Sequence, residues 1–191
     1  RGYILFSKMA KRLEEYAIDE NYSLIIGVSN RLATAVWQRS ISMKVLTQLD
    51  VLFGYGNLGI DNLKLNDSIF HSLWDEQKIN WRRANPYNKV FINKKKKIKL
   101  ISPSVLSIFD IFSYIEDDNY HLDFDKNRIN FLPNFFIGLV PNAGKKNFFF
   151  RVPEFLKPSP LNFIYKDISK NNNIILEKEK CFFTYLDFDA Y

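Results

Sequence analysis

The sequence predicts a protein of the mixed α/β class. Apolar residues recur at three- and four-residue spacing from Phe6 to Ala17, with charged residues between them, which is the pattern of one helix face. Residues 24–28 follow as an apolar run of strand length, and similar runs continue to the end of the chain. Because strand patterns and fewer helical patterns alternate over 191 residues, the chain fits one large α/β domain or two small ones.

The first half of the chain predicts two helices and the strands that follow them. The first helix opens the chain and stops near residues 19–21, and Ser29 and Asn30 can cap a second, shorter helix. Residues 43–53 predict one or two strands with a break near Gln48. We expect the apolar face of the first helix to lie in the core. The apolar face of the first helix contains Phe6, Met9, Ala10, Leu13, Tyr16 and Ala17. The apolar face of the second helix contains Leu32, Ala33, Val36 and Trp37.

A glycine-rich stretch separates the two halves. Glycines at positions 54, 56 and 59 have the spacing of a phosphate loop, but no helix with a Lys-Ser/Thr pair follows, so we interpret them as a flexible connection. Asp67 or Ser68 can cap the next helix, and residues 79–83 continue as a helix or a turn until Asn85 and Pro86. The apolar face of that helix contains Ile69, Phe70, Leu73 and Trp74.

The remainder of the second half predicts mainly strands. Residues 90–92 and 98–101 predict a hairpin with a run of lysines at its tip, from position 94 to 97. Residues 105–112 predict either a buried strand or a short helix. Further strands are predicted at residues 135–140, 148–150, 158–168 and 181–186, with a loop at residues 171–173.

Composition limits the classes of partner and compartment. The net charge is +6, and much of the excess lies in the lysines at positions 94–97 and 99, which form either a solvated hairpin tip or a patch for acidic partners. We do not expect nucleic acid as the partner. No apolar run approaches the ~20 residues that span a bilayer. A single cysteine excludes an internal disulfide and fits a reducing compartment, so we expect a cytoplasmic protein.

Four residues near the middle of the chain are candidates for binding or for packing. We expect Trp74 and Trp81 to be packing anchors rather than residues that stack on a substrate. Arg82 and Arg83 are expected at the surface or in ion pairs, and the alternative is that they reach an anionic or nucleotide-linked substrate.

Other chemically capable residues are isolated. His71 and His121 stand apart from each other and from cysteine, so no metal site is expected. Cys181 lies in an apolar run and is expected to be a buried, inert thiol. Asp187 and Asp189 alternate with a phenylalanine, so their side chains would lie on one side of a strand. They would either cap the end of that strand or act as a pair of general bases.

The beginning of the chain resembles a known family. Residues 1–8, Arg-Gly-Tyr-Ile-Leu-Phe-Ser-Lys, are similar to the pyrophosphate-binding turn of the GNAT superfamily of coenzyme-A-dependent N-acyltransferases, whose pattern is Arg/Gln-x-x-Gly-x-Gly/Ala. The next family signature is a strand followed by Asn-x-x-Ala/Ser and a helix with an aromatic residue. It corresponds here to residues 24–28, Asn30, Ala33 and Trp37.

Later segments also resemble this family. Residues 79–87, 158–167 and 182–189 are similar to the C-terminal part of two-domain GNAT-like proteins found beside bacterial cell-surface polysaccharide genes. The resemblance implies a GNAT-like mixed sheet with flanking helices. Residues 1–58 would be the C-terminal portion of an acyltransferase domain that begins before Arg1, and residues 65–191 a degenerate second GNAT-like domain.

The resemblance implies an N-acyltransferase. Such a protein would move an acyl group, most simply acetyl, from acyl-coenzyme A to an amine, here of a sugar-linked or other cell-envelope precursor. Backbone N–H groups at the start of the first helix would hold the pyrophosphate of coenzyme A. No catalytic residue is assigned. The residues implied in binding the acyl-coenzyme A are Arg1, Gly2, Tyr3, Ile4, Leu5, Phe6 and Asn30.

Three departures from the family pattern motivate an alternative. Ile4 replaces the second glycine of the turn, where a β-branched residue narrows the phosphate site unless its side chain points away. Trp37 replaces the tyrosine that often serves as the general acid, and residues 41–43 stand where the family has Gly-Phe. The alternative is therefore a binding or scaffold protein that keeps the fold without the chemistry.

Overall fold

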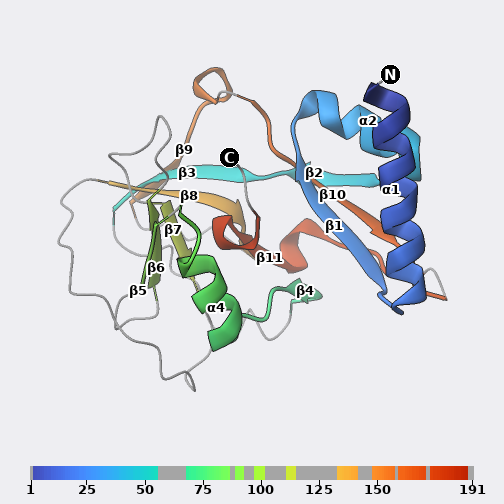
Figure 1. Cartoon of the computed structure of the whole chain (residues 1–191). Helices are drawn as coiled ribbons and strands as arrows, with labels where there is room; N and C mark the ends of the chain where they lie inside the picture. The colour runs from blue at the N-terminus through green and yellow to red at the C-terminus, as the bar shows by residue number, and fades with distance from the viewer. Residues whose placement is uncertain are drawn as a thin grey trace. The chain divides into compact units, whose positions relative to one another are not determined.

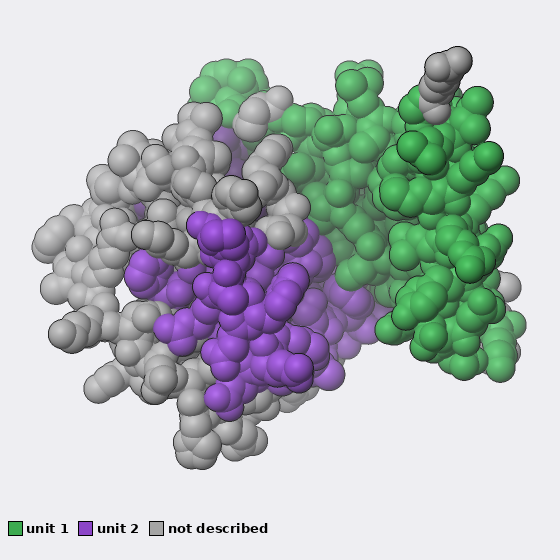
Figure 2. All heavy atoms as spheres, in the orientation of Figure 1, with its two compact units in different colours: residues 1–49, 153–178 green, residues 50–152, 179–191 purple. Residues whose placement is uncertain are grey.

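The computed structural model describes residues 2–55, 68–86, 89–92, 97–101, 111–114, 133–141, 148–157, 159–170 and 173–188. Over these residues the chain is a mixed α/β protein with three α-helices and two sheets, as Figure 1 shows, and this confirms the predicted class. The chain divides into two compact units, which Figure 2 colours separately: unit 1 is residues 1–49 with 153–178, and unit 2 is residues 50–152 with 179–191.

Unit 1 is a three-stranded antiparallel sheet with two helices. The predicted order of helix, strand, capped helix and strand is confirmed, with a second strand starting after a break at Leu49. The last strand of the unit lies between the first two, in the order β1-β10-β2. The elements are α1 (Gly2–Asp19), β1 (Leu24–Ser29), α2 (Arg31–Ile41), β2 (Lys44–Gln48), a 3-10 turn η1 (Glu154–Leu156) and β10 (Asn162–Asp167).

The face that α1 buries differs from the predicted face. Ala10 and Ala17 are buried, with 0% and 6% exposed, as expected. Met9, Leu13 and Tyr16 are exposed at 56%, 43% and 56%, so their prediction as core residues was wrong. Helical spacing shows only which residues lie on the apolar side of the helix. That apolar side is wider than the part of α1 that the neighbouring elements cover.

The reason lies in what α1 packs against. The small side chain of Ala10 allows α1 to approach the unit closely, and Glu14 of α1 pairs with Lys166 of β10 on the same side. This ion pair is half-buried, so the helix turns Glu14 rather than Leu13 toward the sheet. The core cluster of unit 1 contains Ala10, Ile41, Met43 and Ile164, with Phe6, Ile25 and Trp37 packed against it.

Unit 2 is built on a larger mixed sheet. Its described strands follow the order β4-β11-β8-β7-β6-β5, and β3 pairs with both β8 and β9. The predicted hairpin is confirmed, since β5 and β6 pair antiparallel. The elements are β3 (Asp50–Gly54), β4 (Phe70–His71), α4 (Glu76–Arg83), β5 (Lys89–Ile92), β6 (Lys97–Ile101), β7 (Ile111–Tyr114), β8 (Asn134–Leu139), β9 (Phe149–Arg151), η2 (Lys178–Lys180), β11 (Cys181–Thr184) and η3 (Tyr185–Asp187).

The helix predicted after residue 67 is displaced along the chain. Phe70 pairs with Cys181 in a parallel ladder, so this part of the apolar run forms β4 instead of a helix face. The helix begins at Glu76, where the Asp75 side chain accepts a hydrogen bond from the Lys78 backbone N–H at 2.8 Å. A capping aspartate with two basic residues in the last turn is a favourable helix signal, and this cap lies seven residues beyond the predicted cap at Ser68.

The two units do not follow the predicted ranges 1–58 and 65–191. Strand β10 pairs with β1 over residues 162–167 and with β2 on its other side, so residues 153–178 belong with the beginning of the chain. Arg1, residues 94–96, residues 105–110, His121 and Asp189 lie outside the described residues. Among the helices that are described, none has the length and apolar character needed to cross a bilayer.

Candidate functional site

Two helix starts lie at the same end of unit 1. After α1, the chain turns tightly at Asn21, which has a φ of 59°, and the Tyr22 N–H donates to the Ala17 carbonyl at 2.9 Å. Strand β1 then runs back along the unit, so α2 begins toward the end of the unit where α1 begins, as Figure 1 shows. Gly2 opens α1 and Asn30 caps α2, so the two predicted positions mark the two helix starts of this unit.

The start of α1 is open and carries no acidic side chain. The first backbone N–H groups of an α-helix have no acceptor within the helix, which leaves those of Gly2, Tyr3 and Ile4 available. A Cβ added at Gly2 would have no atom within 4 Å. The Ile4 side chain is 61% exposed and points away from the core, so it does not close off the helix start from within the unit. Neither α1 nor α2 has an acidic residue in its first turn.

Phe6 is a packing residue. Its ring meets the Trp37 indole edge to face, with ring centroids 4.8 Å apart and an interplanar angle of 77°. Both residues pack against the core cluster of unit 1. Of the residues predicted to bind the ligand, Tyr3, Ile4 and Leu5 are exposed, whereas Phe6 instead fixes the position of α1 against α2.

Asn30 is the N-cap of α2. Its side-chain oxygen accepts a hydrogen bond from the Ala33 N–H at 2.8 Å, and its backbone carbonyl accepts one from the Thr34 N–H at 2.9 Å. Asn30 is exposed and has extended backbone geometry, as caps do. These contacts show that Asn30 holds the start of α2.

A buried hydroxyl joins three elements beside this cap. Thr34 of α2 donates to the Asn30 carbonyl at 2.8 Å and accepts a hydrogen bond from the Asn162 side-chain amide of β10 at 2.8 Å. The Ser29 hydroxyl of β1 lies 2.7 Å from the same oxygen. Because the Thr34 proton is used on Asn30, Ser29 must be the donor, so the Thr34 oxygen is saturated.

The sequence pattern does not single out Thr34 or Asn162. The only local signal is that Thr34 follows the Asn30 cap by one helical turn, a spacing that also occurs by chance. Asn162 cannot be found from the sequence, because it comes from a strand far along the chain. This network fixes the geometry of the end of the unit where the two helices start.

The variant Thr34→Val is expected to destabilise the protein by about 2 kcal/mol. Valine keeps the volume but leaves the Ser29 hydroxyl and the Asn162 amide without their acceptor in a buried position. Unfolding by urea, followed by circular dichroism, measures the difference. Thr47→Val is the matched control, since Thr47 makes one long hydrogen bond of 3.3 Å to Gln48 at the surface, and its loss should change stability little. Equal losses for the two variants would contradict the role of Thr34.

Asp187 of unit 2 is a buried, heavily hydrogen-bonded carboxylate. One oxygen accepts from the Trp74 indole N–H at 2.7 Å, and the other accepts from the Thr184 N–H at 2.5 Å and from its hydroxyl at 3.2 Å. Burial raises the pKa of the Asp187 carboxyl, and the hydrogen bonds from Thr184, Ser72 and Trp74 oppose this shift. The strand ends at Thr184, and Asp187 closes a capping box on η3. The prediction that Asp187 lies on a strand and shares one side of it with Asp189 was wrong, because β11 ends three residues earlier and Asp187 lies in η3.

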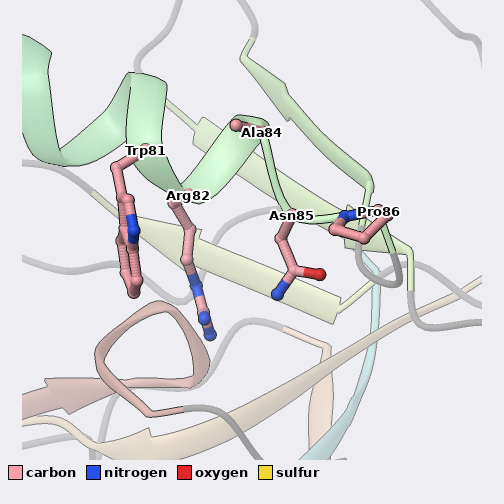
Figure 3. Close-up of a pocket in the computed structure, with 5 residues that line it drawn as sticks. All are labelled: Trp81, Arg82, Ala84, Asn85 and Pro86. Atoms are coloured by element: carbon pink, nitrogen blue, oxygen red, sulfur yellow. The ribbon is translucent and has the colours of Figure 1, made fainter.

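Trp81 and Arg82 have exchanged their expected environments. Trp81 is 68% exposed, so its prediction as a packing anchor was wrong, and Arg82 is buried with 2% exposed. The Arg82 guanidinium donates to the Phe188 carbonyl at 2.7 Å and so ties α4 to the end of the described chain. Trp81, Arg82, Ala84, Asn85 and Pro86 line a cavity of about 380 Å³, which Figure 3 shows.

The remaining candidates behave as structural residues. Cys181 is fully buried in β11, as predicted. The His71 ring nitrogen Nδ1 lies 2.9 Å from the Ser68 hydroxyl. Within the part of the chain that the structure describes, no group of three or more histidine, cysteine, aspartate or glutamate side chains could hold a metal ion.

Comparison with known proteins gives no match. No family model matches this sequence, and neither a curated protein sequence nor a solved structure matches the chain.

Proposed function

We propose that the protein is an N-acyltransferase and that unit 1 binds acyl-coenzyme A at the start of α1. The acceptor is an amine of a sugar-linked or other cell-envelope precursor. The observation that supports this most directly is that α1 and α2 both begin toward one end of the unit, and neither has an acidic residue in its first turn. Arg31 adds a cation in the first turn of α2. Such an end is suited to an anion, and the resemblance of residues 1–8 identifies the anion as a pyrophosphate.

The contacts support different tasks for the predicted residues in this proposal. The free amides of Gly2, Tyr3 and Ile4 would bind the pyrophosphate oxygens, and the open space at Gly2 allows the phosphates to approach the backbone. Phe6 and Asn30 would act indirectly, by holding α1 and α2 in place. In the reaction the amine nitrogen bonds to the thioester carbonyl carbon, the carbon–sulfur bond breaks, and the coenzyme A thiol leaves while the amine loses a proton.

The variant Ile4→Glu tests the anion site without disturbing the core. Ile4 is exposed, and a carboxylate in the first turn of a helix is compatible with the helix dipole, so the fold should keep its stability. The same carboxylate would repel a pyrophosphate by about 1 kcal/mol, so acetyl-coenzyme A should bind about fivefold more weakly. Titration calorimetry with acetyl-coenzyme A on the full chain, with thermal unfolding of each variant, measures both effects.

Ile18→Glu is the matched control. It makes the same substitution in the last turn of the same helix, at a side chain that is 50% exposed. Its affinity for acetyl-coenzyme A should remain that of the wild type. Absence of acetyl-coenzyme A binding at millimolar concentration, or equal binding by Ile4→Glu and the wild type, would refute the proposed site.

A non-catalytic role is the second candidate, and one observation favours it. The Trp37 indole stands where the family has a tyrosine acid, and it is packed against Phe6 rather than directed toward a substrate. An indole N–H does not supply a proton as a phenol does. A protein of this kind would bind acyl-coenzyme A without turnover. Release of free thiol from acetyl-coenzyme A in the presence of a panel of amines separates the two candidates.

A further inference from the structure

An exposed strip of apolar side chains runs along α1 on the side that the core of unit 1 leaves uncovered. This apolar strip consists of Leu5, Met9, Leu13 and Tyr16, and Leu5 is the most exposed of them at 72%. Because an α-helix turns by about 100° per residue, Leu5, Met9 and Tyr16 lie within an arc of about 40°, which Leu13 borders. Figure 1 shows α1 on the outer side of unit 1. A continuous exposed apolar strip of this kind indicates a contact with another protein surface.

The charges of α1 indicate what kind of surface covers this strip. All three of its cations lie in residues 8–12, and all three of its acids lie in residues 14–19. The helix dipole does not account for this order, because it favours acids near the start of a helix and cations near its end. A second α1 that runs in the opposite direction has matching charges, since its acidic half lies beside the basic half of the first. A parallel second helix would bring like charges together.

We propose that the apolar strip of α1 packs against the same strip of a second copy of this chain, with the two helices antiparallel. Such a pair is related by a twofold axis, so every contact occurs twice. Leu5 of each copy faces Tyr16 of the other, and Met9 of both copies lies near the axis. The contact is self-complementary, and unit 1 supplies all of it.

Lys8 and Glu15 supply the charge pairing at the border of this contact. They are one heptad apart, which is about two helical turns, so both lie on the border of the strip opposite Leu13. In the antiparallel pair, each Lys8 meets the Glu15 of the other copy. Glu15 contacts Arg12 of its own helix through Oε2 at 3.2 Å, in a pair whose side chains are both exposed. A carboxylate accepts several hydrogen bonds, so Glu15 can accept from Lys8 as well.

A reversible dimer is expected from a contact of this size. Helix α1 has 18 residues and is about 27 Å long, so two such helices bury less surface than a standard protein interface. We expect a Kd for the dimer of about 10–100 μM. Coenzyme A binding is not required, because Ile4 lies about 100° around the helix from Leu5 and outside the strip.

Sedimentation velocity of the full chain at about 5 to 500 μM tests the proposal. The weight-average mass of the wild type should rise with concentration from that of a monomer toward that of a dimer. Met9→Glu places two carboxylates near the axis and should raise the dimer Kd at least about tenfold. Ile18→Glu is the matched control, because it makes the same substitution at an exposed residue on another side of α1. Its dimer Kd should stay within about twofold of the wild-type value.

A charge exchange tests the antiparallel direction. Lys8→Glu brings two carboxylates together in both symmetric contacts and should raise the Kd about fivefold. The double variant Lys8→Glu/Glu15→Lys exchanges the charges and should return the Kd to within about twofold of the wild type. Both positions are exposed, and thermal unfolding verifies that each variant is folded. Three results would overturn the proposal: a wild type that remains monomeric at about 500 μM, unchanged dimerisation of a folded Met9→Glu variant, or a double variant that dimerises no better than Lys8→Glu.

Discussion

Replacing Gly138 by alanine is expected to destabilise the protein by about 3 kcal/mol. A Cβ at this position in β8 would lie 2.0 Å from the Phe183 carbonyl oxygen and 3.0 Å from the Thr184 Cα. Both are backbone atoms of β11, so no side-chain rotation relieves the clash. Strands β8 and β11 would have to separate at the pair of Gly138 and Thr184, and the ladder between them would be lost. Urea unfolding followed by circular dichroism measures the change.

Gly27→Ala is the control for this prediction. Gly27 is also a strand glycine, but a Cβ added there would lie 3.7 Å from the Ile164 Cγ1 atom, an ordinary contact. Its effect should be below about 1 kcal/mol, and reduced backbone freedom in the unfolded chain could make it stabilising. If Gly138→Ala lowered the free energy of unfolding as little as Gly27→Ala, the close approach of β8 and β11 at Gly138 would be contradicted.

Removing the carboxylate of Asp187 is the second change with a large expected effect. In Asp187→Ala, the Trp74 indole N–H and the Thr184 backbone N–H lose their acceptor, together with the capping box on η3. Leaving buried donors without partners costs about 3 kcal/mol in total. Asp75→Ala removes a cap from α4 at an exposed position, where water can replace the lost acceptor, and should cost clearly less. The midpoints of urea unfolding of Asp187→Ala and Asp75→Ala measure the two losses. Equal midpoints would contradict the prediction.

The pH dependence of Asp187→Ala follows from the direction of its pKa shift. Burial raises the pKa of the carboxyl in the folded protein above the usual value of 3.8, so the folded state binds more protons than the unfolded state between these two values. The free energy of unfolding of the wild type therefore falls as pH rises through this window. The difference between the wild type and Asp187→Ala should be greatest and constant below pH 3.8, should shrink as the pH rises, and should reach a lower constant value above the folded pKa. A difference that grew with rising pH would show that the pKa is lowered.

The candidate site was predictable only in its local parts. The sequence placed Gly2 at a helix start and Asn30 at a helix cap, because both features depend on residues within one turn of the chain. The sequence placed Phe6 on the core face of the first helix, which is confirmed, but its partner Trp37 could not be predicted because that contact requires the position of α2. The saturated Thr34 hydroxyl was missed because one of its partners, Asn162, is separated from it by 128 residues.

The sequence by itself determined the order of helices and strands in unit 1, the hairpin of β5 and β6, and the mixed α/β class. These features follow from apolar spacing and capping residues over short stretches, where the chain chooses its own conformation. Only the tertiary structure decided that β10 lies between β1 and β2 and that Phe70 joins β11. It also decided that Trp81 is open while Arg82 is buried. Such outcomes depend on which distant segment covers each surface, and no local pattern contains that information.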